Sequence, residues 1–89
     1  MATLTEESVL TLEQQIAEFS LVLYNDDYNT FDHVIDCLVK YCEHNAMQAE
    51  QCAWIVHTNG KCAVKSGGYE ELEPICVGLL DNGLSAKIE

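Results

Sequence analysis

The sequence predicts a single α+β domain with the order β-α-α-β-α-β, in which a three-stranded antiparallel sheet packs against three helices. Apolar and polar residues alternate over 18–24 and 84–88, as in half-buried strands. Apolar residues recur at helical spacing over 31–43, with further helical segments at 46–57 and 69–80. Because 89 residues cannot support two cores, one sheet covered by the helices buries all of these faces.

Two regions divide the chain. Residues 1–17 mix Thr, Ser, Glu and Gln with loosely spaced apolar residues, and we expect a flexible amino-terminal extension there. An arm that a partner engages and a simple disordered terminus fit this composition equally well. The core domain is expected at 18–89, beginning with the strand at 18–24.

The predicted helices carry start and stop signals. In the first, over 31–43, the apolar side chains lie on one stripe: Phe31, Val34, Ile35, Leu38 and Cys42. Asn45 followed by Gln48 predicts the cap of the second helix, which we place at 46–57, before Asn59 and Gly60. We expect a short strand at 61–65 and a loop at 66–68.

The third helix, at 69–80, contains Pro74, which has no backbone donor. Either its first turn is kinked, or the regular helix begins near Pro74. The last strand is expected at 84–88.

The charge balance narrows the range of partners. The chain has 15 acidic residues against four lysines and no arginine, a formal charge of -11. This negative charge excludes nucleic acid and acidic membrane surfaces as partners, and leaves cationic peptides, amino groups and basic protein surfaces.

No apolar run is long enough to span a bilayer, and residues 1–18 lack the Lys or Arg of a signal or transit peptide. We expect a cytoplasmic monomer.

The five cysteines are odd in number and form no CxxC pair, so we expect free thiols in a reducing cytosol rather than disulfides. A zinc site from Cys52, His57 and Cys62 would lack the close ligand pairs typical of such sites. We therefore expect no metal and no cofactor.

The segment Asn25-Asp26-Asp27 follows the first strand directly and is our candidate binding site. Its adjacent carboxylates repel each other by about 1 kcal/mol near a surface, which a cationic ligand would relieve. An Asx-turn that caps the following helix is the alternative, and spacing alone favours that turn.

His57, at the end of the second helix, could join these residues as an acceptor for an ammonium ion, or only stabilise the end of its helix. His33 and His44 are expected to be exposed to solvent. An acid–base enzyme using Asp27 and His57 is a rival hypothesis. The chain has no nucleophile elbow and no phosphate loop, and it has little room for a closed active site, so we do not expect an enzyme.

Three motifs in the right order and spacing resemble the ClpS family, the adaptor of the ATP-dependent Clp protease. They are Asn25-Asp26-Asp27-Tyr28, Val34-Ile35-Asp36 and Val56-His57-x-x-Gly60-Lys61, and the resemblance covers residues 19–89. It implies the same fold and an adaptor for N-degrons, proteins that begin with Leu, Phe, Tyr or Trp. The adaptor would deliver them to the amino-terminal domain of a Clp-family AAA+ unfoldase.

The resemblance also implies roles for individual residues. The substrate's α-amino group would be held by Asn25, Asp26, Asp27 and His57. Its first side chain would enter a hydrophobic pocket formed by Phe31, Val34, Ala53, Val56 and Leu84. Tyr28 and Glu70 would contribute to unfoldase docking, and residues 1–17 match the family's flexible extension.

The chain also departs from the family's pattern. Asn29-Thr30-Phe31 replaces the usual Thr-Pro-Met, and Ala53 stands where a large Met is common, which alters both pocket walls. Ile75 replaces a docking Lys.

A different role for the same fold is suggested by the carboxy-terminal domain of the ribosomal stalk protein, but that domain presents a lysine-rich helix, whereas the four lysines here are scattered.

Overall fold

The computed structural model describes residues 18–89 and confirms the predicted order of helices and strands. The predicted amino-terminal extension lies outside the described residues. The elements are β1 (Phe19–Tyr24), α2 (Phe31–Cys42), α3 (Ala46–Asn59), β2 (Lys61–Gly67), α4 (Tyr69–Asp81) and β3 (Ser85–Ile88).

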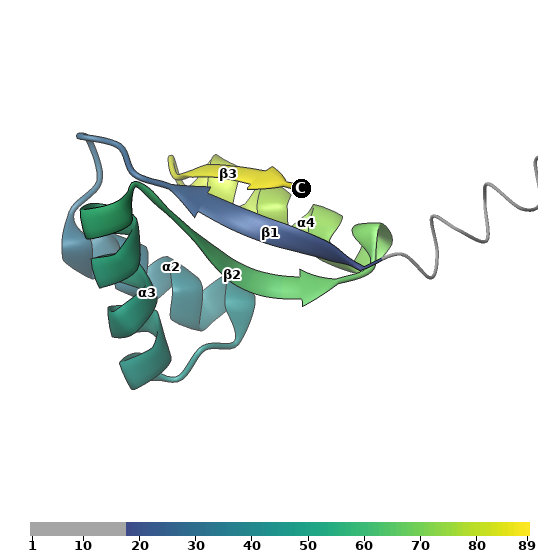
Figure 1. Ribbon diagram of the computed structural model, residues 1–89, viewed down its shortest axis with the longest axis horizontal. Coiled ribbons are helices and arrows are strands. Elements are labelled where there is room, and N and C mark those ends of the chain that lie inside the picture. Colours follow the sequence, from purple (N-terminus) through teal and green to yellow (C-terminus); the bar gives the residue numbers. More distant parts are fainter. Residues whose placement is uncertain (1–17) are drawn as a thin grey trace, which may run out of the picture.

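The three strands form one antiparallel sheet with β1 in the centre, in the order β2-β1-β3. Behind this sheet lie α2 and α4, while α3 lies at the end where β1 stops and β2 starts (Figure 1). Leu21 and Leu23 of β1 are buried among residues of all three helices, including Leu38, Val56 and Leu79. This single core positions the loop that follows β1 against the end of α3.

Local signals explain where the helices begin and end. Thr30 caps α2 by accepting a hydrogen bond from the backbone N–H of His33 at 3.1 Å. Asn45 and Gln48 form the predicted capping box at the start of α3. After α3, Gly60 adopts a φ of 90°, a left-handed conformation in which glycine avoids a Cβ clash. The predicted cap and the predicted stop are both confirmed.

For the chain after α3, one prediction is corrected and one of two alternatives is excluded. The loop expected at 66–68 is mostly strand, because Ser66 and Gly67 pair with β1 and extend β2. The helix α4 runs unbroken from Tyr69 through Pro74, so it does not begin near the proline. Since Pro74 has no N–H, the carbonyl of Glu70 loses its usual donor one turn later.

The expected exposure of His33 and His44 was wrong, because contacts between distant elements half-bury both rings. One ring nitrogen of His33 lies 2.9 Å from the Asn82 carbonyl oxygen, beyond the end of α4. One ring nitrogen of His44 lies 2.6 Å from the Val64 carbonyl oxygen on β2. Neither partner is close in sequence, so helical spacing did not reveal these contacts.

All five cysteines carry free thiols, and Cys37, Cys42 and Cys76 are buried. Burial raises the pKa of the Cys42 and Cys62 thiols to about 11, which keeps them protonated at neutral pH. Within residues 18–89, no group of His, Cys, Asp and Glu side chains is arranged to hold a metal ion. No helix in the same part of the chain is long and apolar enough to cross a membrane.

Candidate functional site

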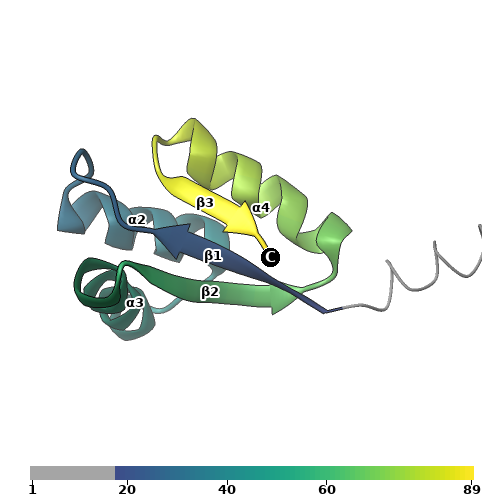
Figure 2. The ribbon, with the colours of Figure 1, turned by 45° about the horizontal axis from the view of Figure 1, so that its top comes forward.

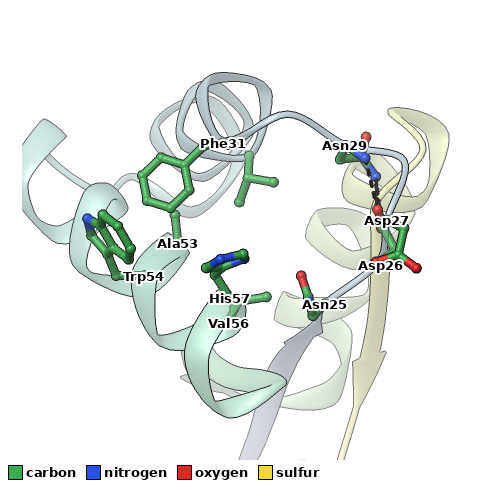
Figure 3. A pocket seen from close by; sticks show the side chains of 10 residues that line it. Asn25, Asp26, Asp27, Asn29, Phe31, Ala53, Trp54, Val56 and His57 are labelled. Atoms are coloured by element: carbon green, nitrogen blue, oxygen red, sulfur yellow. Dashed lines mark hydrogen bonds between the residues drawn. The ribbon is translucent and has the colours of Figure 1, made fainter.

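An open pocket of about 490 Å³ lies between the loop after β1 and the second half of α3 (Figure 3). Its lining combines polar side chains from the loop with apolar and aromatic ones from two helices. The lining residues are Asn25, Asp26, Asp27, Asn29, Phe31, Val34, Ala53, Trp54, Val56 and His57.

Backbone pairing brings the two sides of this pocket together. The N–H of Asn25 donates to the carbonyl of Gly60 at 2.9 Å, which joins the end of β1 to the turn after α3. Tyr24 pairs with Lys61 immediately beside this contact. The last turn of α3, which carries His57, is therefore held next to Asn25.

Asp26 organises the loop through its own hydrogen bonds. One carboxylate oxygen accepts from the backbone N–H groups of Tyr28 and Asn29, each at 3.0 Å. The Asn29 side-chain amide donates to both carboxylate oxygens, at 2.9 and 2.8 Å, and also to the Gly83 carbonyl at 2.8 Å. For Asp26, the Asx-turn considered as the alternative is what the structure shows, and it anchors the loop to the segment before β3.

These contacts also keep Asp26 ionised. Partial burial raises its pKa, but the hydrogen bonds from Asn29, Tyr28 and Ser85 outweigh that effect and hold the pKa below its ordinary value. A fixed negative charge therefore lies at the base of the loop at neutral pH.

The other polar side chains of the pocket have no partner within the part of the chain that is described. Among the hydrogen bonds and ion pairs of residues 18–89, none involves the side chains of Asn25, Asp27 or His57, all of which are exposed. Asp27 and His57 are accordingly not paired as an acid–base couple would be. An amide, a carboxylate and an imidazole are left free to bind a ligand.

The opposite wall is apolar and aromatic. Ala53 and Val56 are 3% and 4% exposed and form the helix surface beneath the pocket. The Phe31 and Trp54 rings meet edge to face, with centroids 5.0 Å apart and planes at 61°. The Trp54 and His57 rings lie 6.2 Å apart at 71°. Figure 3 shows Phe31, Ala53, Trp54 and His57 grouped on the side of the two helices.

Most of the side chains predicted for the site line this pocket, but Leu84 does not. It is 4% exposed and lines an adjacent cavity of about 30 Å³, which also includes Val34 and Val56. Leu84 thus lies behind the pocket wall rather than in it.

Sequence reasoning missed Trp54 and Asn29, which both line the pocket. Trp54 precedes His57 by three residues, a spacing that places two side chains on the same side of a helix. Asn29 follows Asp26 by three residues in a turn sequence, which is the available signal for its hydrogen bonds.

The two residues predicted for unfoldase docking lie far apart. Tyr28 is 94% exposed on the loop beside the pocket, and Glu70 is exposed in the first turn of α4. Figures 1 and 2 both place that loop and the start of α4 at opposite ends of the domain.

Comparison with known proteins places this chain in a family. The family model described as "ATP-dependent Clp protease adaptor protein ClpS" matches residues 14–87. The chain belongs to the ClpS family. The resemblance seen in the sequence motifs is thereby confirmed, and the family is described as an adaptor rather than as a protease.

Curated relatives agree with ClpS membership. A ClpS adapter protein from Synechocystis is 37% identical over 67 residues, covering 71% of this chain and 65% of its own length. One from Nostoc is 35% identical over 72 residues, covering 76% and 71%. The E3 ubiquitin-protein ligase UBR1 of Drosophila melanogaster is 33% identical over 63 residues, which are 71% of this chain but 4% of the ligase. The chain thus spans just under two thirds of the Synechocystis protein.

Proposed function

We propose that this ClpS-family chain binds N-degrons, proteins that begin with Leu, Phe, Tyr or Trp, and delivers them to a Clp-family AAA+ unfoldase. The observation that carries the proposal is the pocket itself. It combines an apolar lining with the free polar side chains of Asn25, Asp27 and His57 around a volume of about 490 Å³.

At a protein's amino terminus, the α-ammonium group and the first side chain are attached to the same carbon atom, Cα. The ammonium has three donors, and Asn25, Asp27 and His57 supply acceptors of three kinds for them. The charge of Asp26 adds a favourable potential, although its oxygens are already occupied within the loop. An internal Leu or Phe has no such ammonium, so the polar groups select a true amino terminus.

The apolar lining supplies a second part of the affinity. Burying a Leu or Phe side chain against Phe31, Val34, Ala53 and Val56 contributes about 1.5–3 kcal/mol. A side chain branched at Cβ has little rotational freedom and fits poorly under the Phe31 ring, so we expect Ile and Val to bind weakly.

The relatives support a role in recognising other proteins rather than in catalysis. Similar segments occur in Clp protease adapters and in an E3 ubiquitin-protein ligase, which share no described catalytic reaction. A segment that two such different proteins share is therefore best explained as a recognition module.

Delivery requires a second surface that stays free while a substrate is bound. Glu70 on α4 meets this requirement, because it lies at the end of the domain away from the pocket (Figure 2). Tyr28 lies beside the pocket, where a bound substrate and an unfoldase would compete for space. We therefore assign docking to the α4 end, with Glu70 as its acidic contact.

Fluorescence anisotropy of a labelled peptide that begins with Phe tests the proposal directly. The same peptide with an acetylated amino terminus is the matched control, since it keeps the side chain and loses the charge. We expect binding of the free peptide and a loss of about 1–3 kcal/mol on acetylation, because acceptors that the bound peptide covers would be left unpaired. Equal binding of the two peptides would contradict the proposal, and so would binding of neither across first residues Phe, Leu, Tyr and Trp.

A further inference from the structure

Trp54 is the only tryptophan in the chain, and it lines the pocket although it is 53% exposed. Its position explains this exposure. Ala49, Ala53 and Val56 form the buried face of α3, whereas Trp54 lies outside that face and contacts Phe31 of α2. The indole therefore lies at the edge of the pocket beside Phe31 instead of entering the core (Figure 3).

Three rings follow one another along this side of the pocket, and we call them the aromatic wall: Phe31, Trp54 and His57. Trp54 is the middle ring, edge to face with Phe31 at 5.0 Å and with His57 at 6.2 Å. Phe31 comes from α2 and the other two from α3, so packing between the helices assembles the wall (Figure 3).

The space beside the aromatic wall suits a planar side chain. Ala53, between the helices, is small and 3% exposed, so no bulky group fills the pocket beneath the rings. The remaining apolar lining, Val34 and Val56, is aliphatic. A first side chain that enters the pocket meets rings on one side and methyl groups on the other.

We propose that Trp54 determines specificity, by making the pocket prefer the aromatic first residues Phe, Tyr and Trp over Leu. The inference rests on the proposed function, since it requires the first residue of an N-degron to enter this pocket. Leu and Phe gain alike from apolar burial, but only a ring gains the additional aromatic pairing. That pairing corresponds to a preference of roughly two- to tenfold.

Substitution by leucine separates this role from that of a general apolar wall. Trp54→Leu keeps an apolar side chain at the position and removes the ring, while Trp54→Phe keeps a ring. Ile55→Leu is the matched control, because Ile55 is the neighbouring exposed residue of α3 and does not line the pocket. Each substitution is at an exposed position, and circular dichroism would verify that each variant is folded.

The experiment measures anisotropy with labelled peptides that differ only in their first residue: Phe, Tyr or Leu. We expect the unmodified protein and the Ile55→Leu variant to bind the Phe and Tyr peptides roughly two- to tenfold more tightly than the Leu peptide. In Trp54→Leu, the Phe and Tyr peptides should fall to the affinity of the Leu peptide, which itself changes little. Trp54→Phe should retain most of the preference.

A Trp54→Leu variant that weakens all three peptides equally would overturn the inference, and so would one that changes none of them. In both cases the peptides still bind the unmodified protein, so the proposed function stands. If no peptide bound the unmodified protein, the proposed function would fail and the inference with it. Trp54 emission gives a label-free second readout: we expect the Phe peptide to change it and the acetylated Phe peptide to leave it unaltered.

Discussion

Two surface depressions among residues 18–89 are nearly equal in size but differ in construction. The pocket beside α3 has a volume of about 490 Å³, and a groove on α4 has about 500 Å³. The α4 groove is lined by Glu70, Glu73, Pro74 and Val77, all from one helix. The pocket is lined by a loop and two helices, and it combines free polar side chains with an aromatic wall.

This difference shows that volume alone does not mark a ligand site. A binding pocket needs apolar walls on several sides and a few polar groups directed at the same point. The α4 groove has carboxylates but no enclosing wall, which suits contact with a broad basic surface better than capture of one residue. Peptide capture and partner docking are therefore expected at separate ends of the molecule.

The largest expected effect comes from removing a free polar group of the pocket. His57→Ala and Asn25→Ala should each weaken binding of a Phe peptide by about 1–3 kcal/mol, because a donor of the ammonium loses its acceptor. Both side chains are exposed, so thermal unfolding should change little. Anisotropy measures the affinity and circular dichroism the stability.

Glu70→Gln in the α4 groove is the control for this prediction. It should leave peptide affinity unchanged and lower affinity for the amino-terminal domain of the unfoldase, since docking is proposed at that end. Equal loss of peptide binding in all three variants would mean that the two ends are not functionally separate.

A smaller effect is expected from opening the pocket rim. Phe31→Ala removes the ring that lies over the entrance beside Trp54, so peptides that begin with Ile or Val should bind better relative to Leu, by about 1 kcal/mol. Anisotropy with Leu, Ile and Val peptides gives this ratio. A variant that excludes Ile and Val as strongly as before would remove Phe31 from the selection.

The smallest expected effect is a pH dependence of folding stability that arises from Asp26, in the loop after β1. Burial raises the pKa of Asp26, but its hydrogen bonds lower the pKa by more, so the folded carboxyl releases its proton at a lower pH than the unfolded one. Its stabilising contribution is therefore complete above the ordinary pKa of about 3.9 and is lost as pH falls through the lowered value. Urea unfolding of the unmodified protein and of Asp26→Asn should show a stability difference that is constant near neutral pH and shrinks below about pH 4. A stability difference that grew on acidification would contradict a lowered pKa of Asp26 in the folded protein.

Some features of the site were readable from neighbouring residues. The capping box of Asn45 and Gln48, the stop at Gly60 and the Asx-turn of Asp26 each depend on residues within a few positions of one another. Such contacts form wherever the local chain has the right groups. The segments that form the pocket were recognisable for the same reason, because they lie at the ends of clearly patterned strands and helices.

Other features depended on contacts between distant segments. The burial of His33 follows from the Asn82 carbonyl, 49 positions away, and Leu84 lies behind the pocket because β3 packs beside β1. Trp54 belongs to the site because α2 places Phe31 against it. The spacing of residues along the chain does not predict these contacts. It indicates which way a side chain points from its own helix, but not which residues of another helix lie next to it.

The sequence by itself determined the order of strands and helices, the turns that join them and the segments that carry the polar groups, because these depend on local spacing and backbone preference. The tertiary structure decided which side chains meet: Asn25 beside the turn at Gly60, Asp26 tied through Asn29 to Gly83, and Trp54 between Phe31 and His57. The physical reason is that burial of one shared core sets the distances between segments that are remote along the chain.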